Sequence, residues 1–185
     1  MAFARDYKQR LLAALETVDL ARVEDLIAVF RRARDEDRQI FVFGNGGSAA
    51  TANHFACDVV KGASYGRQKR FKIMSLAEQI PTMTAYSNDV GYASVFVEPL
   101  KNFARPGDVA MAISGSGNSE NVVRAIDYAN SIGCYTVGLS GLSGGRLRPS
   151  VDLSIHVAHD HMGRVEDAHF FVCHMVCYQF MDGEA

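Results

Sequence analysis

The chain has 185 residues, of which 48% are hydrophobic and 22% charged, and its formal net charge at pH 7 is −2. These values describe one globular domain with a sizeable core, and they exclude the strongly basic face of a nucleic-acid-binding protein. No apolar run has the length of a membrane span, and the charged first residues do not form a signal peptide. We therefore expect a cytoplasmic protein with neither a membrane nor a nucleic acid as partner.

Residues 4–36 alternate apolar and charged side chains at helical spacing. We predict two helices with a break near Asp19, whose side chain would cap the second helix. Two amphipathic helices ahead of the first strand have no slot in a sheet, so we expect residues 1–36 to pack at a subunit interface as a helical bundle. Residues 37–185 would form an α/β sandwich, and the whole chain, 1–185, a single domain.

From residue 37 onwards, strand, turn and helix patterns alternate. Strands are expected at 39–44, 71–76, 109–113, 134–139 and 152–157, and helices at 48–62, 92–103, 118–132 and 164–181. Strands that alternate with helices form a parallel sheet covered on both sides. The predicted fold class is α/β, a three-layer sandwich with a five-stranded parallel sheet preceded by two N-terminal helices. In such sheets ligands bind beyond the carboxyl ends of the strands, where the strand order reverses.

A glycine-rich turn, residues 44–48 (Gly-Asn-Gly-Gly-Ser), follows the first predicted strand. Its glycines have no Cβ atom, so the backbone can turn sharply and approach a ligand. We expect Ser48 to cap the following helix, whose free N–H groups and dipole attract an anion. His54 and Asp58 stand four residues apart on one face of that helix. This spacing suits a metal-binding or acid–base pair, and equally a solvated surface pair.

A second loop, residues 113–121 (Ile-Ser-Gly-Ser-Gly-Asn-Ser-Glu-Asn), follows the third predicted strand. Short hydroxyl groups and exposed backbone N–H groups suit the oxygens of a phosphate monoester. The loop has no lysine or arginine, so phosphate would be held by neutral hydrogen bonds and a helix terminus. An ordinary strand–helix turn with a serine cap has the same composition. Two such turns at one edge of the sheet favour a ligand site.

The first turn also fits the loose GxGxx(G/A) fingerprint of a dinucleotide-binding fold. That fingerprint needs an acidic residue about 20 positions further on. There is none between Asp58 and Glu78. A dinucleotide-binding enzyme is therefore the less favoured alternative.

With these two loops the chain resembles the sugar isomerase (SIS) domain, and more closely the bacterial phosphoheptose isomerases. The motifs of this likeness are residues 44–48, His54-Phe55-Ala56, Asn88-Asp89, residues 113–119 and a last helix that carries His174. The resemblance covers nearly the whole chain. It implies the flavodoxin-like SIS sandwich, a homotetramer with active sites at subunit interfaces, and one zinc ion per subunit. The implied activity is the conversion of sedoheptulose 7-phosphate to D-glycero-D-manno-heptose 7-phosphate.

The resemblance also assigns roles to individual residues. The phosphate would be held by Ser48, Ser114, Ser116 and Ser119, and the sugar would be lined by Asn45, Gly46, Gly47, Asn88 and Asp89, with Gly115 and Glu166 completing the substrate site. The metal ligands would be His54, Asp58, Glu166 and His174. Isomerisation through an enediol needs a base, an acid and a group that stabilises a negative oxygen. Asp58 would be the base, His174 the acid and zinc the third group.

Two residues depart from the family pattern. Asp58 stands where the family usually has glutamate, and Glu166 where it usually has glutamine. A shorter base must lie nearer its substrate, or its helix must shift. Two histidines with two carboxylates still form a zinc-binding set. The alternative is a non-catalytic SIS protein that binds a sugar phosphate or a protein partner, as members associated with the replication initiator do.

The spacing within the last helix poses a geometric problem. Glu166 and His174 stand eight residues apart, a rise of about 12 Å along a regular helix. Both reach one ion only if Glu166 lies at the helix start, for which Gly163 provides a signal. His169, three residues after Glu166, is the alternative partner on that side of the helix. A simpler interpretation of His174 is a core histidine in an apolar helix.

The four cysteines, Cys57, Cys134, Cys173 and Cys177, show no CxxC spacing and lie in apolar sequence surroundings. We expect buried thiols rather than a disulfide framework or a metal site. None of the predicted chemistry depends on them.

Overall fold

The computed structural model describes residues 2–183. In this range the helices are α1 Phe3–Leu15, α2 Leu20–Asp35, α3 Gly47–Cys57, α4 Ile80–Asp89, α5 Val97–Phe103, α6 Glu120–Ser131 and α7 Met162–Asp182. The strands are β1 Gln39–Gly44, β2 Lys72–Ser75, β3 Val109–Ser114, β4 Tyr135–Ser140 and β5 Leu153–His156. Every predicted strand is present, and each of its ends lies within one residue of the prediction.

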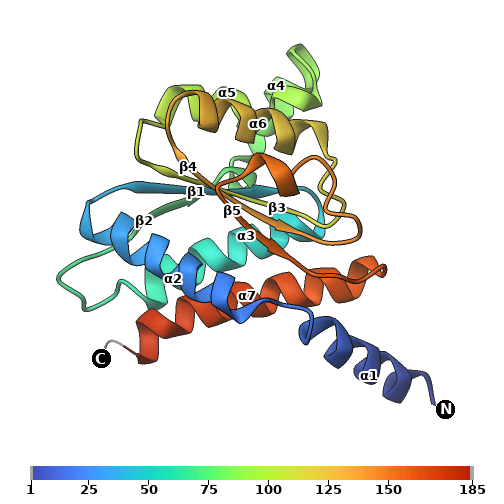
Figure 1. Ribbon diagram of the computed structural model, residues 1–185. Helices are drawn as coiled ribbons and strands as arrows, with labels where there is room; N and C mark the ends of the chain where they lie inside the picture. Colours follow the sequence, from blue (N-terminus) through green and yellow to red (C-terminus); the bar gives the residue numbers. More distant parts are fainter. Residues whose placement is uncertain (1, 184–185) are drawn as a thin grey trace.

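The strands form one parallel sheet in the order β2-β1-β3-β4-β5. Gly44 of β1 lies opposite Ile113 of β3. The chain passes from β1 to β2 on one side and then to β3 on the other, so the strand order reverses between β1 and β3 (Figure 1). The carboxyl ends of these two strands therefore flank the position where sheets of this type bind ligands.

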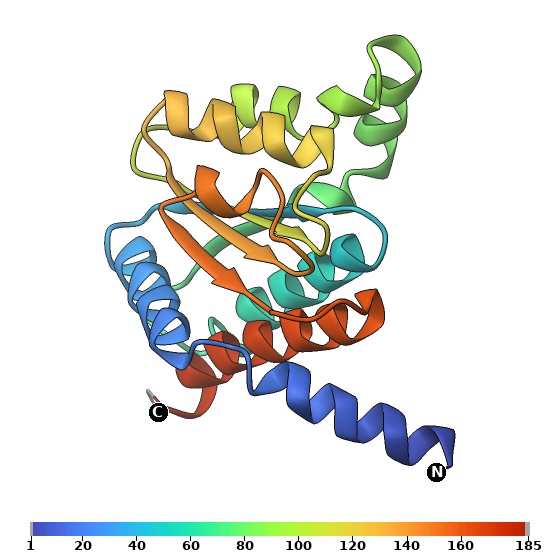
Figure 2. The same cartoon turned by 45° about the vertical axis from the view of Figure 1, so that its right-hand side comes forward.

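Helices cover both faces of the sheet. In two views α5 and α6 lie over one face, while α2, α3 and α7 lie over the other (Figure 1, Figure 2). β1 and β3 are central strands, so they are buried along almost their whole length. Burial on both faces accounts for their nearly continuous apolar sequences. The predicted three-layer α/β sandwich is confirmed.

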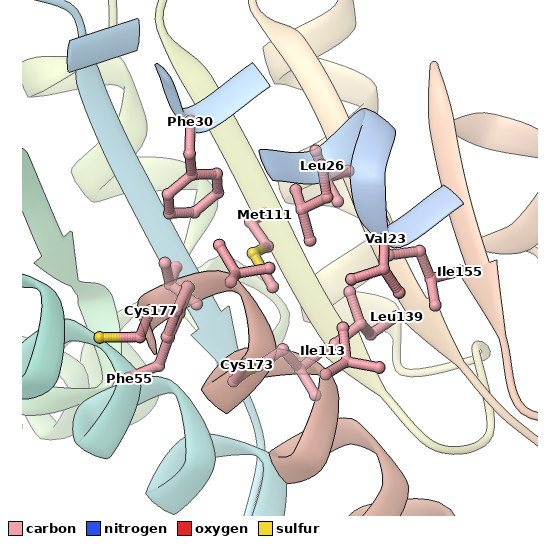
Figure 3. Close-up of a cluster of buried hydrophobic side chains, with 14 of the residues drawn as sticks. Val23, Leu26, Phe30, Phe55, Met111, Ile113, Leu139, Ile155, Cys173 and Cys177 are labelled. Atoms are coloured by element: carbon pink, nitrogen blue, oxygen red, sulfur yellow. The ribbon is translucent and has the colours of Figure 1, made fainter. Parts of the chain in front are cut away.

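The larger core cluster lies between the sheet and helices α2, α3 and α7. Figure 3 shows Phe30 of α2 and Phe55 of α3 in one group with Cys173 and Cys177 of α7. Burying a large apolar side chain contributes about 1.5–3 kcal/mol. These contacts hold α3 and α7 together against the sheet, and both helices carry predicted site residues.

The two N-terminal helices differ in their packing. The predicted break is present, and the Asp19 carboxylate accepts a hydrogen bond from the Ala21 N–H at 3.0 Å. Helix α2 covers the sheet with Val23, Leu26, Ile27, Val29, Phe30 and Ala33. Helix α2 therefore belongs to the core of the sandwich, and its expected place at a subunit interface stays a prediction. Helix α1 buries only Ala14 and extends away from the body (Figure 2), and its place at a subunit interface stays a prediction.

The segment between β2 and β3 departs from the predicted elements. No helix was predicted at α4, yet one forms there with Pro81 in its first turn, and none of its ten residues is buried. Helix α5 begins at Val97 rather than at residue 92, because a short 3₁₀ turn, Tyr92–Ser94, precedes it. A helix without a buried stripe has no apolar periodicity, so the hydrophobic pattern gives no signal for it.

Three of the four cysteines are buried, but Cys57 is exposed. The buried stripe of α3 runs from Ser48 to Ala56, and Cys57 lies off it, so the prediction of a buried thiol is wrong at this position. Burial raises the pKa of the Cys134 thiol to about 11, which keeps it protonated and unreactive. Among residues 2–183, no helix combines the length and the apolarity needed to cross a lipid bilayer.

Candidate functional site

The turn between β1 and α3 depends on glycine. Gly46 has φ 53° and ψ −120°, a conformation that other residues adopt only with strain. A Cβ atom on Gly44 would lie 2.5 Å from the carbonyl oxygen of Ile113 in the neighbouring strand. Glycine at these two positions lets the turn lie directly against the end of β3.

Helix α3 begins at Gly47, and its N-cap residue, Gly46, has no side chain that could bond the first N–H groups. Ser48 lies inside the first turn, so the prediction that it caps the helix is wrong. The N-cap lies two residues before Ser48, because glycine tolerates the cap conformation. The first N–H groups of α3 therefore remain available to an anion.

The loop between β3 and α6 folds on its own hydroxyl groups. Ser114 Oγ accepts a hydrogen bond from the Gly117 N–H, and Ser116 Oγ accepts one from the Asn118 N–H, both at 3.2 Å. Ser119 is the N-cap residue of α6, yet its hydroxyl makes no capping bond to the helix described here. The Ser119 hydroxyl and the first N–H groups of α6 are therefore open to a ligand.

The loop after β4 supports this second loop. A Cβ atom on Gly117 would lie 2.0 Å from the carbonyl oxygen of Gly144. The Arg146 N–H donates to Asn118 Oδ1 at 3.1 Å, and the Arg146 side chain donates to Glu120 at 2.7 Å. The bond from Arg146 is the main cause that lowers the pKa of the Glu120 carboxyl. The β3–α6 loop is thus held on its outer side, while its hydroxyl side stays open.

The two loops line one cleft of about 240 Å³ at the carboxyl ends of β1 and β3. The lining residues are Asn45, Gly46, Gly47, Ser48, Ile113, Ser114, Gly115, Ser116, Ser119, Met162 and Glu166. Ile113 and Met162 were not predicted, because an apolar residue at a strand or helix end gives no chemical signal. None of the described residues that line the cleft is a lysine or an arginine. An anion here would be held by hydroxyl groups and helix N-termini.

Glu166 reaches the cleft from α7. Its Oε1 atom lies 2.6 Å from the position that a Cβ atom would take on Gly47. The carboxylate is therefore packed against the first turn of α3, and glycine at position 47 leaves the room for it. A carboxylate accepts hydrogen bonds and repels a phosphate, so Glu166 suits the hydroxyl groups of a sugar.

Asn88 and Asp89 do not line the cleft of this chain. They lie at the exposed end of α4, where Asn88 Nδ2 donates to Asp89 Oδ1 at 2.8 Å. Their predicted contact with the sugar stays a prediction.

His54 of α3, His174 of α7 and Asp58 meet at the surface, and Asp58 begins the π-helical turn Asp58–Gly62. His54 Nε2 lies 3.1 Å from Asp58 Oδ2 and 3.3 Å from His174 Nε2, and His174 Nε2 lies 3.6 Å from Asp58 Oδ2. Phe170 packs against the two imidazole rings, with centroid distances of 4.7 and 4.5 Å. The sequence correctly grouped these three residues, and their catalytic roles stay predictions.

This His–Asp–His group fits a metal ion. Its three ligand atoms lie within 4.8 Å of one another. Atoms bound at about 2.0–2.2 Å to a tetrahedral zinc ion are about 3.3–3.6 Å apart, close to the separations in this group. Three protein ligands leave one tetrahedral position open, as catalytic zinc sites do.

The two other candidate ligands on α7 are placed differently. The helix is continuous from Met162, so Glu166 lies within it, outside the three-residue group, and its role as a fourth ligand stays a prediction. His169 is fully buried, with Nε2 3.1 Å from the Ser140 carbonyl oxygen, and burial lowers its pKa to about 4. His169 is a neutral core histidine, so its interpretation as the alternative metal partner is wrong.

The cleft and the His–Asp–His group lie along the same two helices. His54 follows Gly47 by seven residues in α3, and His174 follows Glu166 by eight residues in α7. These spacings are rises of about 10 and 12 Å. An extended seven-carbon sugar phosphate is of comparable length. The arrangement therefore allows one ligand to occupy the cleft and reach a metal-binding group.

Two polar residues beside the cleft were not predicted. Asn121 of α6 is 2% exposed, and its amide pairs with that of Asn45. The Tyr92 hydroxyl donates to Asn45 Oδ1 at 2.8 Å. No motif singles out Tyr92, and Asn121 is one of several polar residues in the second loop.

Comparison with known proteins identifies the family. The sequence pattern of the SIS domain family matches residues 3–141, which is more than half of the chain. The chain belongs to the SIS domain family. The cleft between the β1 and β3 loops is thus the cleft of an SIS domain.

Individual SIS domains narrow the assignment. A probable phosphoheptose isomerase of Thermoplasma acidophilum is 33% identical over 174 residues, which cover 94% of this chain and 95% of the relative. The solved phosphoheptose isomerase of Neisseria gonorrhoeae is 27% identical, with a TM-score of 0.86 over 96% of this chain and 95% of that chain. The phosphoheptose isomerase structure from Francisella tularensis, at 23% identity and a TM-score of 0.90 over 96% of both chains, supports the fold. This SIS domain is of the phosphoheptose isomerase type.

Proposed function

We propose that this SIS domain is an aldose–ketose isomerase that converts sedoheptulose 7-phosphate to D-glycero-D-manno-heptose 7-phosphate through an enediol. One observation carries the proposal. A cleft lined by hydroxyl and N–H groups and a His–Asp–His group lie along the same pair of helices, α3 and α7. Relatives named phosphoheptose isomerases support the substrate class.

The phosphate is assigned to the second loop and the two helix starts. Ser114, Ser116 and Ser119 offer hydroxyl groups on one side of the cleft, and Ser48 offers one on the other. Each hydrogen bond to a charged acceptor is worth about 1.5–3 kcal/mol. A cleft that has no lysine or arginine in its lining can therefore still bind the phosphate dianion if several such hydrogen bonds form together.

The sugar is assigned to the first turn and to Glu166. The backbone of residues 45–47 and the Glu166 carboxylate border the cleft on the side of α3 and α7. Glu166 accepts hydrogen bonds from sugar hydroxyl groups, which the family's usual glutamine would both accept and donate. The replacement of glutamine by Glu166 therefore influences which arrangement of sugar hydroxyl groups the site binds best.

The proton transfers are assigned to Asp58 and His174. Asp58 removes the proton from C1 of the ketose while His174 protonates the C2 carbonyl oxygen, which gives the enediol. Return of the proton to C2 and loss of the O1 proton give the aldose. Asp58 Oδ2 is the oxygen that faces both imidazoles, which leaves Oδ1 free to accept the substrate proton.

Zinc is the proposed metal, one ion per subunit. His54, Asp58 and His174 would hold it. Glu166, which the resemblance adds as a fourth ligand, would have to turn away from Gly47 to reach the ion and would then fill the position that three ligands leave open. When bound, zinc supplies a Lewis acid that stabilises negative charge on the substrate oxygens. The donor set of two imidazoles and a carboxylate supports this choice.

Asp58 is one methylene shorter than the family's usual glutamate, and a local backbone feature accompanies it. A π-helical turn, Asp58–Gly62, begins at this residue. Such turns are rare and frequently occur at functional sites. We propose that the wider turn places the shorter carboxylate within reach of the substrate.

We further propose a cytoplasmic homotetramer with active sites at subunit interfaces. Helix α1 buries only Ala14 within the chain, and Phe3, Phe171 and Tyr178 are exposed large side chains. Exposed Asn88 and Asp89 would contact the sugar in the cleft of a neighbouring subunit. Four free cysteines in the described chain fit a reducing compartment.

A non-catalytic SIS protein that binds a sugar phosphate or a protein partner is the second candidate. The replacements at Asp58 and Glu166 favour it. A dinucleotide enzyme has less support, because the cleft of about 240 Å³ is smaller than the roughly 300–1,000 Å³ of pockets for larger ligands.

The test is incubation with sedoheptulose 7-phosphate before and after removal of metal with a chelator, with NMR detection of the aldose. We expect product with zinc-loaded protein, loss of product after chelation and recovery when zinc is added back. Tight binding of the ketose phosphate without product would support the non-catalytic candidate. If the protein neither binds the ketose phosphate nor gives product, the isomerase and a sugar-phosphate-binding SIS protein are both contradicted.

A further inference from the structure

Two side-chain amides join the first turn of the cleft to helix α6. Asn45 Nδ2 donates to Asn121 Oδ1 at 2.9 Å, and Asn121 Nδ2 donates to Asn45 Oδ1 at 2.8 Å. Asn45 follows β1, and Asn121 is the second residue of α6, the helix that follows the β3–α6 loop. The pair therefore bridges the two parts of the chain that form opposite sides of the cleft.

The neighbouring donors fix the orientation of both amides. The Val122 N–H can only donate, and it donates to Asn121 Oδ1 at 3.0 Å, which identifies that atom as the oxygen. Asn121 Nδ2 must then face the oxygen of Asn45, which also accepts from the Tyr92 hydroxyl at 2.8 Å. Both ends of the Asn45 amide are thus bonded within the protein. Asn45 borders the cleft, and in the described chain one N–H of its Nδ2 is left for the sugar.

The hydrogen bonds that the serine hydroxyl groups of the cleft accept do not cross from one loop to the other. Ser114 and Ser116 bond to N–H groups of their own loop. Between residues 44–48 and 113–121 of the described chain, the Asn45–Asn121 pair is the side-chain hydrogen bond that crosses from one loop to the other. The pair thus adds a side-chain link between the two loops beyond the backbone pairing of β1 with β3.

We propose that Asn121 is a positioning residue that sets the distance between the starts of α3 and α6 and so fixes the width of the phosphate cleft. Tyr92 extends the same network to the segment after α4. The inference rests on the proposed function, because it concerns the phosphate of that substrate. Asn121 itself acts through Asn45 and the two loops, and it touches no reacting atom.

The substitution Asn121→Asp tests this role with almost no change of shape. An aspartate at this position keeps an acceptor for the Val122 N–H but cannot donate to Asn45. Either orientation of the Asn45 amide then places two oxygens against each other. The two loops would move apart, and a phosphate would lose part of its set of hydrogen bonds.

We expect the KM of N121D for sedoheptulose 7-phosphate to rise about tenfold, since loss of one partner of a buried hydrogen bond costs about five- to a hundredfold. kcat should change by no more than about threefold, because the reacting carbons lie at the other end of the ligand. The dissociation constant for the ketose phosphate, measured by calorimetry, should rise by the same factor as KM. A role in stability alone would leave these constants unchanged in folded protein.

Asn130→Asp is the matched control on the same helix. Asn130 donates to the Ser150 carbonyl oxygen at 2.7 Å and accepts from Thr136 Oγ1 at 2.8 Å, at the far end of α6 from the cleft. The same chemical change here should leave KM within about twofold of wild type. Tyr92→Phe removes one hydrogen bond of the network and should raise KM about threefold.

The outcomes separate this inference from the proposed function. If wild type binds the ketose phosphate but gives no aldose, the isomerase proposal fails, and the dissociation constants still test Asn121. Unchanged KM and dissociation constant in folded N121D would overturn the inference, as would equal changes in N121D and N130D. If N121D does not fold, an unchanged KM in Tyr92→Phe overturns it.

Discussion

The cleft between residues 44–48 and 113–121 and the His54–Asp58–His174 group are built in opposite ways. The cleft is formed by two glycine-rich turns, and a side chain at Gly44 or Gly117 would collide with neighbouring main chain. The group consists of partly exposed side chains: the exposed fraction is 48% for His54, 27% for Asp58 and 38% for His174. Binding geometry is therefore part of the fold, whereas the chemistry rests on side chains that can change without disturbing the fold.

The substitution with the largest expected effect is Asp58→Asn, which removes the proposed general base and leaves the fold intact. Loss of a general base reduces turnover by about 10²–10⁴-fold. Because Asp58 is outside the cleft, the dissociation constant for sedoheptulose 7-phosphate should stay within about threefold of wild type. Turnover is measured with zinc-loaded protein, and binding by calorimetry.

A matched change at Asp182, near the end of α7, serves as the control for D58N. Asp182→Asn should retain full turnover, since this carboxyl lies outside both the cleft and the group. Substantial turnover in D58N would contradict the assignment of Asp58 as the base.

The next largest effect concerns His169, which attaches α7 to the end of β4 beside both regions. Its pKa is lowered to about 4, mainly by burial, from an ordinary value of 6.5. The folded state thus holds His169 neutral, while the unfolded chain takes up a proton near its ordinary pKa. The contribution of His169 to the free energy of unfolding is therefore fully present above about pH 6.5. It falls by about 3 kcal/mol as the pH drops towards 4.

Urea unfolding of metal-free protein between pH 7 and pH 4 measures this loss. His169→Gln still donates to the Ser140 carbonyl oxygen but does not titrate, so its stability should fall less steeply over this range. An identical pH dependence in wild type and H169Q would show that His169 does not contribute as stated.

A smaller effect on stability is expected from Gly44→Ala. This substitution tests whether the cleft needs the turn at residue 44 to lie directly against the end of β3. The added methyl group would meet the Ile113 carbonyl oxygen at 2.5 Å. Overpacking of this kind costs about 1–3 kcal/mol, and it should also weaken phosphate binding because the turn must move. Urea midpoints and calorimetry measure the two effects.

Gly163→Ala is the control for G44A, because a Cβ atom there would make only ordinary contacts at 3.4 Å and beyond. It should be neutral or stabilising by up to about 1 kcal/mol. If G44A is as stable as G163A, the turn has more freedom than its contacts indicate.

The smallest expected effect is that of Ser119→Ala. The hydroxyl makes no capping bond in the described structure, so its loss should change stability by less than about 0.5 kcal/mol. KM should rise about tenfold from the lost bond to phosphate, with kcat nearly unchanged. Ser131→Ala, at the other end of the same helix, is the control and should leave KM unaltered. A KM for S119A equal to that of wild type would remove Ser119 from the phosphate site.

The two regions also differ in how well the sequence predicts them. Buried strands and glycine-rich strand ends have strong local signals, so the sheet and nine of the cleft residues were predicted. The four-residue spacing of His54 and Asp58 placed both on one helix face. That His174 joins them follows from the packing of α3 on α7, which the resemblance implied and the spacing alone did not.

What the sequence did not give depends on contacts between distant segments. The packing of α2 on the sheet, the pairing of Asn45 with Asn121 and the burial of His169 under Ser140 each join residues far apart in the chain. Helix α4 has no buried stripe and therefore no periodic signal. The predicted cap of α3 was wrong by two positions, because Gly46 rather than Ser48 is its N-cap residue.

The most direct test of the account is an experimental structure of zinc-loaded D58N with sedoheptulose 7-phosphate bound. We predict that the phosphate lies within hydrogen-bonding distance of Ser114, Ser116 and Ser119, and that C1 and C2 of the same molecule lie beside position 58 and His174. A phosphate bound elsewhere, or reactive carbons that lie away from the His–Asp–His group, would contradict it.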